Sequence, residues 1–244
     1  MQARQLRRCS QADADALGDC NIINGDIIID ASFAGNLTLP FSIAHVIGSI
    51  NSTGSAGAIS TNINNITGLT AQSLISITGS LYLWEAHQLE LLSLPALKTV
   101  GAIEMLSAWK LFSIGLDAGI DSVSNISLSF TSLTSLDGIN PTSMEYLDVT
   151  NNGGMTTIDL PIRTVSDYIK IGGLTVDLEL NLPDLVTANN VTLIDVNKVE
   201  LPNLQTVNQS LGLYGNTIDQ FSAPVLETVS GSLSLSRITP TFHS

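Results

Sequence analysis

The chain has 244 residues, of which 44% are hydrophobic and only 13% charged, and its formal net charge is −13. Nucleic-acid binding needs clustered Lys and Arg, so this acidic balance argues against it, and an anionic membrane surface would repel the chain as well. Its apolar runs fall short of the 18 residues that a membrane-spanning helix requires. Abundant, evenly spread apolar residues exclude a disordered chain.

The N-terminus carries a basic segment, residues 1–8, that no apolar stretch follows, so we expect a basic leader remnant and no signal peptide. Cys9 and Cys20 are the two cysteines of the chain. Between them, Ser10 and Asp13 form a capping-box pattern and Gly18 can end a helix. We expect residues 9–21 to form a short helical N-cap, closed by a Cys9–Cys20 disulfide or left with two free thiols.

A repeat of about 22 residues dominates the rest of the chain. The pattern Leu-Pro-x-Leu-x-Thr-Val occurs at 94–100 and 201–207, with looser copies elsewhere, and a short apolar-x-apolar strand follows each copy. Successive strands are 20–23 residues apart, except for one step of 31. The first apolar residues of these strands are Ile27, Ile50, Leu81, Ile103, Ile126, Leu147, Ile169, Val191, Leu211 and Leu233.

This alternation is typical of strands with one buried face. One rung cannot bury its apolar edge alone, but stacked rungs form a continuous Leu, Ile and Val core between parallel strands. The repeat therefore predicts a mainly β chain: a right-handed parallel β-solenoid of about ten rungs over residues 22–236, with the handedness taken from the crossover rule. Glycines before several strands, such as Gly48 and Gly79, are expected at a bend, and the recurrent prolines in turns.

Two departures from the repeat carry further expectations. The step of 31 places a polar loop insertion at residues 51–68, read as a solvated loop or as a contact loop. The other end lacks a counterpart to the N-cap, so residues 237–244 are expected to be a frayed tail of a truncated chain. An uncapped last rung would also allow edge-to-edge self-association.

Six Asn-x-Ser/Thr sequons agree with a secreted, N-glycosylated protein. They begin at Asn36, Asn51, Asn65, Asn125, Asn190 and Asn208.

Candidate catalytic groups are sparse. Asp148, Asp167 and Asp195 lie in or beside strands but at different offsets, so they are expected to be scattered solvated acids and not the paired carboxylates of a solenoid polysaccharide hydrolase or lyase. The histidines, His45, His87 and His243, are expected in turns or in the tail. The metalloprotease, serine-hydrolase and nucleotide motifs are missing from the sequence, and no metal or other cofactor is expected.

Four aromatic residues form the best candidate ligand platform. Tyr82, Trp84, Trp109 and Phe130 fall at or just after three consecutive predicted strands. Exposed together, their rings would stack against sugar rings; the alternative is packing in the core or at solenoid corners. Asn151, Asp195 and Asn216 follow strands at offsets of four or five residues, where such side chains bond backbone groups of a turn.

The opening Cys9…Asp13-Ala-Asp-Ala-Leu17…Cys20-x-x-Ile-x-Gly25-Asp26-Ile27, followed by Leu-Pro-x-Leu-x-Thr-Val rungs, resembles the receptor L-domain-like, leucine-rich-repeat-like solenoid. It is similar to fungal GPI-anchored cell-wall organisation and ascospore-wall proteins. The resemblance implies a secreted glycoprotein of the wall or outer plasma membrane, needed for wall integrity and without assigned chemistry. A Ser/Thr-rich stalk and an anchor signal are not seen in this sequence, so we expect membrane attachment only through a GPI anchor that is absent from it.

These observations favour a non-enzymatic cell-surface glycoprotein that contributes to fungal wall organisation, with wall polysaccharides or wall proteins as its partners. Recognition of a glycan or peptide on one solenoid face is the alternative, and a solenoid hydrolase or lyase is a remote one.

Overall fold

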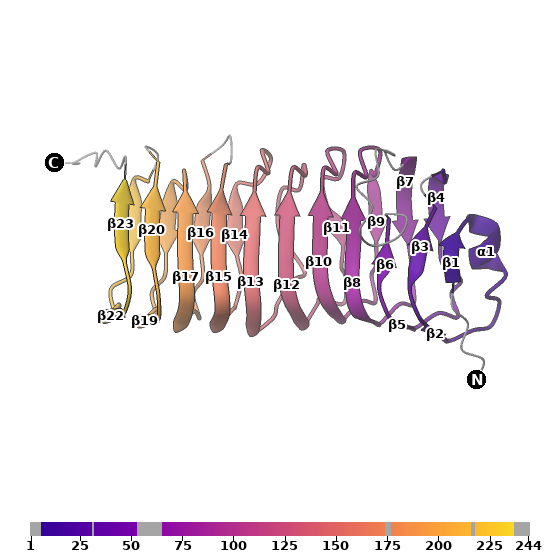
Figure 1. The fold of residues 1–244 in the computed structure, drawn as a ribbon, viewed down its shortest axis with the longest axis horizontal. Coiled ribbons are helices and arrows are strands. Elements are labelled where there is room, and N and C mark those ends of the chain that lie inside the picture. The colour runs from indigo at the N-terminus through magenta and orange to yellow at the C-terminus, as the bar shows by residue number, and fades with distance from the viewer. Residues whose placement is uncertain (1–5, 31, 53–64, 174–176, 216–217, 237–244) are drawn as a thin grey trace.

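The computed structural model describes residues 6–30, 32–52, 65–173, 177–215 and 218–236, and in it the chain winds into an elongated parallel β-solenoid. Figure 1 shows the strands side by side along the rod. The short helix α1 (Gln11–Asp15) and β1 (Leu6–Cys9) lie at one end, and β22 (Thr228–Val229) and β23 (Leu233–Ser236) lie at the other. No helix of the described residues is long and apolar enough to cross a membrane.

One long sheet of 15 strands runs the length of the rod. Its further members are β2 (Ile22–Asn24), β3 (Ile27–Ile29), β5 (His45–Ile47), β6 (Ile50–Asn51), β8 (Ser76–Trp84), β10 (Thr99–Leu106), β12 (Ser122–Ser129), β13 (Ser143–Thr150), β15 (Thr164–Gly172), β17 (Thr187–Ile194), β19 (Thr206–Val207) and β20 (Leu211–Tyr214).

Two four-stranded sheets complete the turns. One contains β4 (Ala34–Thr38), β7 (Asn65–Thr70), β9 (Leu91–Ser93) and β11 (Ile114–Gly115). The second contains β14 (Thr157–Asp159), β16 (Glu179–Asn181), β18 (Lys198–Glu200) and β21 (Gln220–Ser222).

The predicted strand register is confirmed position by position. Ile27 pairs with Ile50, Ile50 with Leu81, and so on through every predicted position to Leu211, which pairs with Leu233. All these pairings are parallel, and the ten positions enclose nine turns of the solenoid. The spacing of the apolar positions thus correctly predicted which residues face inward. A shift of one residue would have placed the apolar side chains of each strand on the solvated face.

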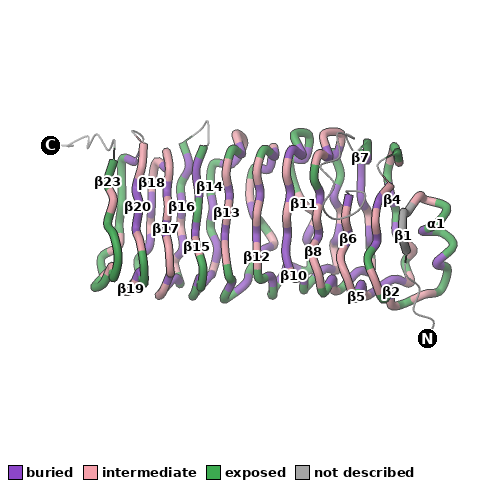
Figure 2. The backbone as a smooth tube through the Cα atoms, viewed as in Figure 1, coloured by how far each residue is buried: buried purple, intermediate pink, exposed green. Residues whose placement is uncertain are grey.

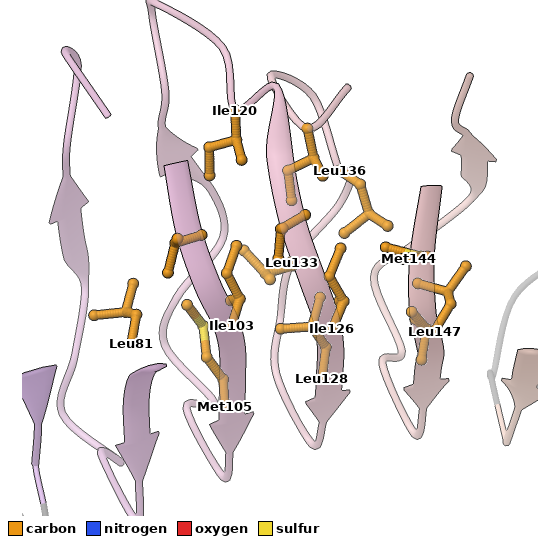
Figure 3. Close-up of a cluster of buried hydrophobic side chains, with 14 of the residues drawn as sticks. Leu81, Ile103, Met105, Ile120, Ile126, Leu128, Leu133, Leu136, Met144 and Leu147 are labelled. Carbon is orange, nitrogen blue, oxygen red and sulfur yellow. The ribbon is translucent and has the colours of Figure 1, made fainter. Parts of the chain in front are cut away.

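The inward-facing residues form one continuous core along the rod. Figure 3 shows Leu81, Ile103, Ile126 and Leu147 following one another on adjacent strands, with Met105 and other apolar side chains filling the space beside them. These four residues are at most 1% exposed. Figure 2 shows buried and more exposed residues alternating along the long strands, which is the pattern of a sheet with one solvated face.

The recurrent Leu-Pro segments form the turns that return the chain to the long sheet. In two of them the amide of Leu97 bonds the carbonyl of Leu94 at 3.1 Å, and that of Leu204 bonds Leu201 at 3.2 Å. Proline stands second in each of these turns, where its fixed φ suits the turn and no ladder N–H is needed. The predicted placement of the prolines is thus confirmed.

A column of glycines forms a bend in the long sheet. Gly25 and Gly48 have positive φ values of 126° and 151°, and the Gly79 amide bonds the Gly48 carbonyl at 2.8 Å. A Cβ built on Gly48, Gly79 or Gly101 would lie 2.5–2.8 Å from a backbone oxygen of the preceding turn. Glycine is required here by close backbone stacking as much as by the bend that the sequence predicted.

The N-terminal end of the rod is covered. Ser10 caps α1 in a capping box with Asp13, and the Ser10 hydroxyl and amide hold the pKa of the Asp13 carboxyl below its usual value. Gln11 accepts a bond from the Thr38 amide at 2.8 Å and donates to the Thr38 carbonyl at 3.0 Å, which ties α1 to β4. No strand was predicted for residues 6–8, which were expected to be part of a basic leader remnant. In the structure they belong to β1, which pairs in parallel with β3.

The other end differs. Leu233 and Leu235 of β23 occupy inward positions but are 59% and 61% exposed (Figure 2). The tail 237–244 lies outside the described residues. The predicted insertion 51–68 is narrower than expected, because Asn51 ends β6 and residues 65–68 belong to β7; residues 53–64 lie outside the described part.

Candidate functional site

The turns that follow the strands of the long sheet repeat one backbone conformation. In seven consecutive turns, the residue four positions after the first apolar residue of the strand has a left-handed backbone conformation. These residues are Glu85, Ser107, Phe130, Asn151, Gly173, Asp195 and Gly215, with φ between 51° and 109°. The turns therefore stack in register, and we call the row that they form over residues 84–90, 106–112, 129–134 and 150–153 the carboxyl edge.

Trp84 ends β8 at the start of the carboxyl edge and is 39% exposed. Its indole stacks on Tyr82 with ring centroids 4.8 Å apart. The buried Ser52 hydroxyl accepts from the Trp84 amide at 2.9 Å and donates to the Trp84 carbonyl at 3.1 Å. Ser52 follows β6 at an inward position that is apolar in the other turns. Its hydroxyl bonds both backbone polar groups of Trp84 and so fixes the backbone at the end of β8.

Trp109 lies one turn further along and is 54% exposed. Its indole stacks nearly parallel on the His87 ring, with centroids 4.3 Å apart and an interplanar angle of 8°. His87 Nε2 lies 2.8 Å from a Glu85 carboxylate oxygen, at ion-pair distance but without hydrogen-bond geometry. The Ser132 hydroxyl of the next turn donates to the Trp109 carbonyl. One neighbouring turn thus covers a face of the indole, and the other bonds the backbone of Trp109.

Phe130 occupies the left-handed position after β12, with a φ of 56°, and its ring is 47% exposed. A bulky side chain is unusual in this region of backbone space, where Gly, Asn and Asp are favoured. The later turns of the solenoid follow that preference with Asn151, Gly173, Asp195 and Gly215, whereas the two turns before Phe130 carry Glu85 and Ser107 at the same place. Phe130 therefore combines a strained backbone with an apolar side chain in water.

The structure brings the four predicted platform residues to three consecutive turns, but not into a single stack. Among the described residues, Trp84 stacks on Tyr82 and Trp109 stacks on His87, and no ring stack joins the two pairs. Tyr82 is half-buried on the face of β8, whereas Trp84, Trp109 and Phe130 are exposed. Full burial in the core does not occur for these three. Whether they bind a ligand stays a prediction.

Sequence reasoning missed several members of this region. His87 was expected only as a turn residue, and Phe112, exposed in the turn after β10, was not singled out. Tyr146 and Tyr168 form a second stack on the long sheet, with centroids 5.1 Å apart and planes 1° from parallel. The strand register placed these tyrosines side by side, so pairing the predicted strands could have found them.

Burial raises the pKa of Tyr146 and of Tyr168, and the carboxylates of Asp148 and Asp167 add to both shifts, so these two acids lie near the same tyrosine pair while Asp195 does not. Asp148 on the long sheet lies 3.6 Å from Lys170 Nζ, Asp167 is exposed on β15, and Asp195 occupies a left-handed turn. The described residues hold no group of three His, Cys, Asp or Glu side chains that could bind a metal ion. His45 Nδ1 lies 2.8 Å from the Ser76 hydroxyl, and His243 is outside the described residues.

The turn asparagines differ from the prediction in one respect. Asn151 and Asp195 take left-handed turn positions, and Asn216 lies outside the described residues. The more important side chain is the neighbouring Asn152, which is fully buried. Its Oδ1 accepts from the Thr131 amide at 2.9 Å and from the Thr131 hydroxyl at 2.7 Å, and its Nδ2 donates to the Leu128 and Thr150 carbonyls.

The cysteine pairing stays a prediction. The Cys20 thiol is half-buried and free with respect to the described side chains. The side chain of Cys9 lies outside them, although its backbone ends β1.

Burial raises the pKa of Tyr82 to about 12, and the nearby Glu104 carboxylate adds to the shift. Between pH 10 and pH 12 the folded protein holds this proton while the unfolded chain releases it, so stability is expected to fall as pH rises through that window. Urea midpoints measured from pH 9 to pH 12 should decline less steeply for Tyr82→Phe than for the native chain. Equal slopes would contradict the shift.

Comparison with known proteins gives one consistent group. The chain is 31% identical to the protein named ecm33 of Aspergillus fumigatus over 92% of its own length and 54% of that protein. It is also 31% identical to the cell wall mannoprotein PST1 of Saccharomyces cerevisiae, over 93% of the chain and 48% of PST1. The chain is a homologue of fungal cell-wall proteins. It spans about half the length of the curated relatives that it matches.

A further relative is the cell surface GPI-anchored protein ECM33 of Candida albicans, 28% identical over 90% of this chain and 51% of that protein. No protein-family model and no solved structure matches the chain. The resemblance seen in the opening cysteine segment and the rungs is confirmed for the fungal wall proteins. The finer likeness to receptor L domains stays a prediction.

Proposed function

We propose that this protein is a non-enzymatic, extracellular glycoprotein that helps to organise the fungal cell wall. The observation that carries the proposal is homology over nine-tenths of the chain to proteins named as cell-wall proteins. The fold supports it, because a parallel solenoid with one continuous core is a stiff rod that presents the same side-chain rows over its length. Glycan hydrolysis needs a closely spaced pair of carboxylates, and among the described acids Asp148 lies against Lys170 while Asp195 occupies a turn.

The experiment is deletion of the gene that encodes this chain in its own fungus. We expect the deletion strain to be hypersensitive to wall-binding dyes, and a copy encoding the native protein to restore resistance. Normal dye resistance in the deletion strain would contradict the wall role.

A second experiment tests whether the protein is an enzyme. The purified protein, incubated with wall glucan and chitin, should release no new reducing ends. Their release would contradict the proposal that the protein is non-enzymatic.

The six predicted sequons differ in how exposed their asparagines are. Asn36, Asn65 and Asn208 are exposed, whereas Asn190 Nδ2, the atom to which a glycan would be attached, donates to the Asp167 carbonyl and to Gln209 Oε1. Asn51 and Asn125 are intermediate. We expect glycan at the three exposed sites and little at Asn190. Enzymatic deglycosylation in heavy-oxygen water followed by peptide mass spectrometry measures occupancy, and full occupancy at Asn190 would contradict this assignment.

A further inference from the structure

We propose that the carboxyl edge at Trp84, Trp109 and Phe130 binds a neutral polysaccharide chain. This inference rests on the proposed wall function and gives it a ligand class. Three large rings stand exposed on three consecutive turns of one edge. Exposed large apolar side chains that gather on one edge often mark an interaction site, because leaving them in water is unfavourable.

The face of Trp109 is open on one side only. His87 and Trp109 occupy equivalent places in adjacent turns, and their rings stack along the solenoid axis. The next two turns carry Ser132 and Gly153 at that place, so the ring column stops after Trp109. The indole face away from His87 therefore looks toward small residues. A flat sugar ring can continue the stack there, beside Phe130.

The aromatic groups are positioned before any ligand arrives. The Ser52 hydroxyl holds both backbone polar groups of Trp84, and Tyr82 covers one face of its indole. The His87 ring, which lies at ion-pair distance from the Glu85 carboxylate, covers one face of the Trp109 indole. Binding then loses little side-chain freedom, which is the main way in which preorganisation raises affinity.

Phe130 supplies an independent observation. Its left-handed backbone costs of order 1–3 kcal/mol for a residue of this kind, and about half of its surface still stays in water. A residue that is both strained and exposed contributes nothing to folding that Asn or Gly would not supply better. Such positions cluster at ligand-binding sites, so the strain at Phe130 points to a contact made outside the chain.

The surface next to the rings selects the ligand. The row that begins at Tyr82 continues with Glu104, Ser127 and Asp148, and the row that begins at Trp84 continues with Leu106, Ser129 and Thr150. Both rows therefore carry hydroxyls beside the rings, and the Thr150 hydroxyl donates to the Ser129 hydroxyl at 3.3 Å. Adjacent strands are about 4.8 Å apart, close to the length of one hexose unit in an extended glycan. The net charge of −13 disfavours an anionic polymer. Rings, hydroxyls and acidity together fit an uncharged polysaccharide.

The test uses the full purified chain with three soluble neutral probes: a β-1,3-glucan, a chitin oligomer and a mannan. Binding is measured by calorimetry and by tryptophan fluorescence. We expect saturable binding of at least one probe and weakening by about tenfold or more in Trp109→Ala. Phe41→Ala is the matched control, because Phe41 is a 79% exposed ring in a turn before β5, away from the edge, and should bind as the native chain does.

Phe130→Asn separates ligand contact from structure. It should raise the thermal midpoint by about 2–4 °C, since Asn tolerates the left-handed backbone, while weakening glycan binding. A more stable variant with native affinity would overturn the role of Phe130, and failure of all three probes would overturn the inference. The inference would also be overturned if sedimentation showed a dimer of the native chain that Trp109→Ala no longer forms, because a second copy would then cover the rings. A dye-sensitive deletion strain together with a protein that binds no glycan would leave the wall function standing and this inference refuted.

Discussion

Asn152→Ala is expected to lower the free energy of unfolding by about 3–5 kcal/mol, a large part of the total stability of a typical protein. Asn152 is fully buried and makes four hydrogen bonds. Alanine would leave the Thr131 amide and the Leu128 and Thr150 carbonyls without this partner in the interior. Each buried polar group that loses its partner costs about 1–3 kcal/mol, because water cannot replace the bond.

The measurement is urea denaturation followed by circular dichroism, with hydrogen exchange at the Thr131 amide as a local reading. The exchange rate of that amide should rise strongly in Asn152→Ala. Asn151→Gly is the matched control, since Asn151 is the adjacent exposed asparagine with a φ of 57°, a value that glycine adopts freely. We expect the control to change stability by less than about 1 kcal/mol. Equal effects at both positions would refute the buried network.

Asn151 and Asn152 also show where sequence reasoning ends. Alternation of apolar and polar residues determined the inward side of every long strand from Ile27 to Leu233, because a period of two leaves only two choices. That alternation stops at the left-handed residue, which redirects the chain. Nothing in two consecutive asparagines tells which amide enters the core. The turn geometry decides it, and it becomes visible only in the structure.

The sequence likewise predicted one part of the candidate site and not the other. The repeat placed Trp84, Trp109 and Phe130 on consecutive turns, since equivalent positions of a solenoid are neighbours. It did not predict that His87, and not Trp84, would stack on Trp109, because both His87 and Trp109 lie beyond the left-handed residue of their turns. The opposing strands are two to six residues long, with many of only two or three, and such segments carry too little periodicity to be recognised.

Strand β1 was not predicted from the sequence for a related reason. The segment Leu6–Cys9 contains two arginines and no apolar alternation, so its sequence resembles a basic leader. It pairs with β3 because a solenoid end offers unpaired backbone groups to whatever segment lies next to it. Backbone pairing of this kind depends little on side chains and leaves almost no trace in the sequence.

Gly48→Ala is expected to destabilise the protein by about 3–5 kcal/mol through two separate effects. The φ of 151° at Gly48 is a conformation that alanine adopts only with strain. In addition, the new Cβ would lie 2.5 Å from the Gly25 carbonyl oxygen and 2.6 Å from its carbon. Both atoms belong to the backbone of the preceding turn. They cannot rotate away as a side chain could, so the stacked turns must separate locally.

Gly35→Ala isolates the first effect, the backbone strain. Gly35 also has a positive φ, 120°, but a Cβ there would meet no atom within 4 Å. It should therefore show only the backbone strain, of order 1–3 kcal/mol, and a smaller loss of the urea midpoint than Gly48→Ala. The difference between the two variants measures how tightly consecutive turns are stacked at this bend. Equal losses would mean that the backbone of the Gly25 turn yields to the methyl group, and that the glycine column is needed only for its φ angles.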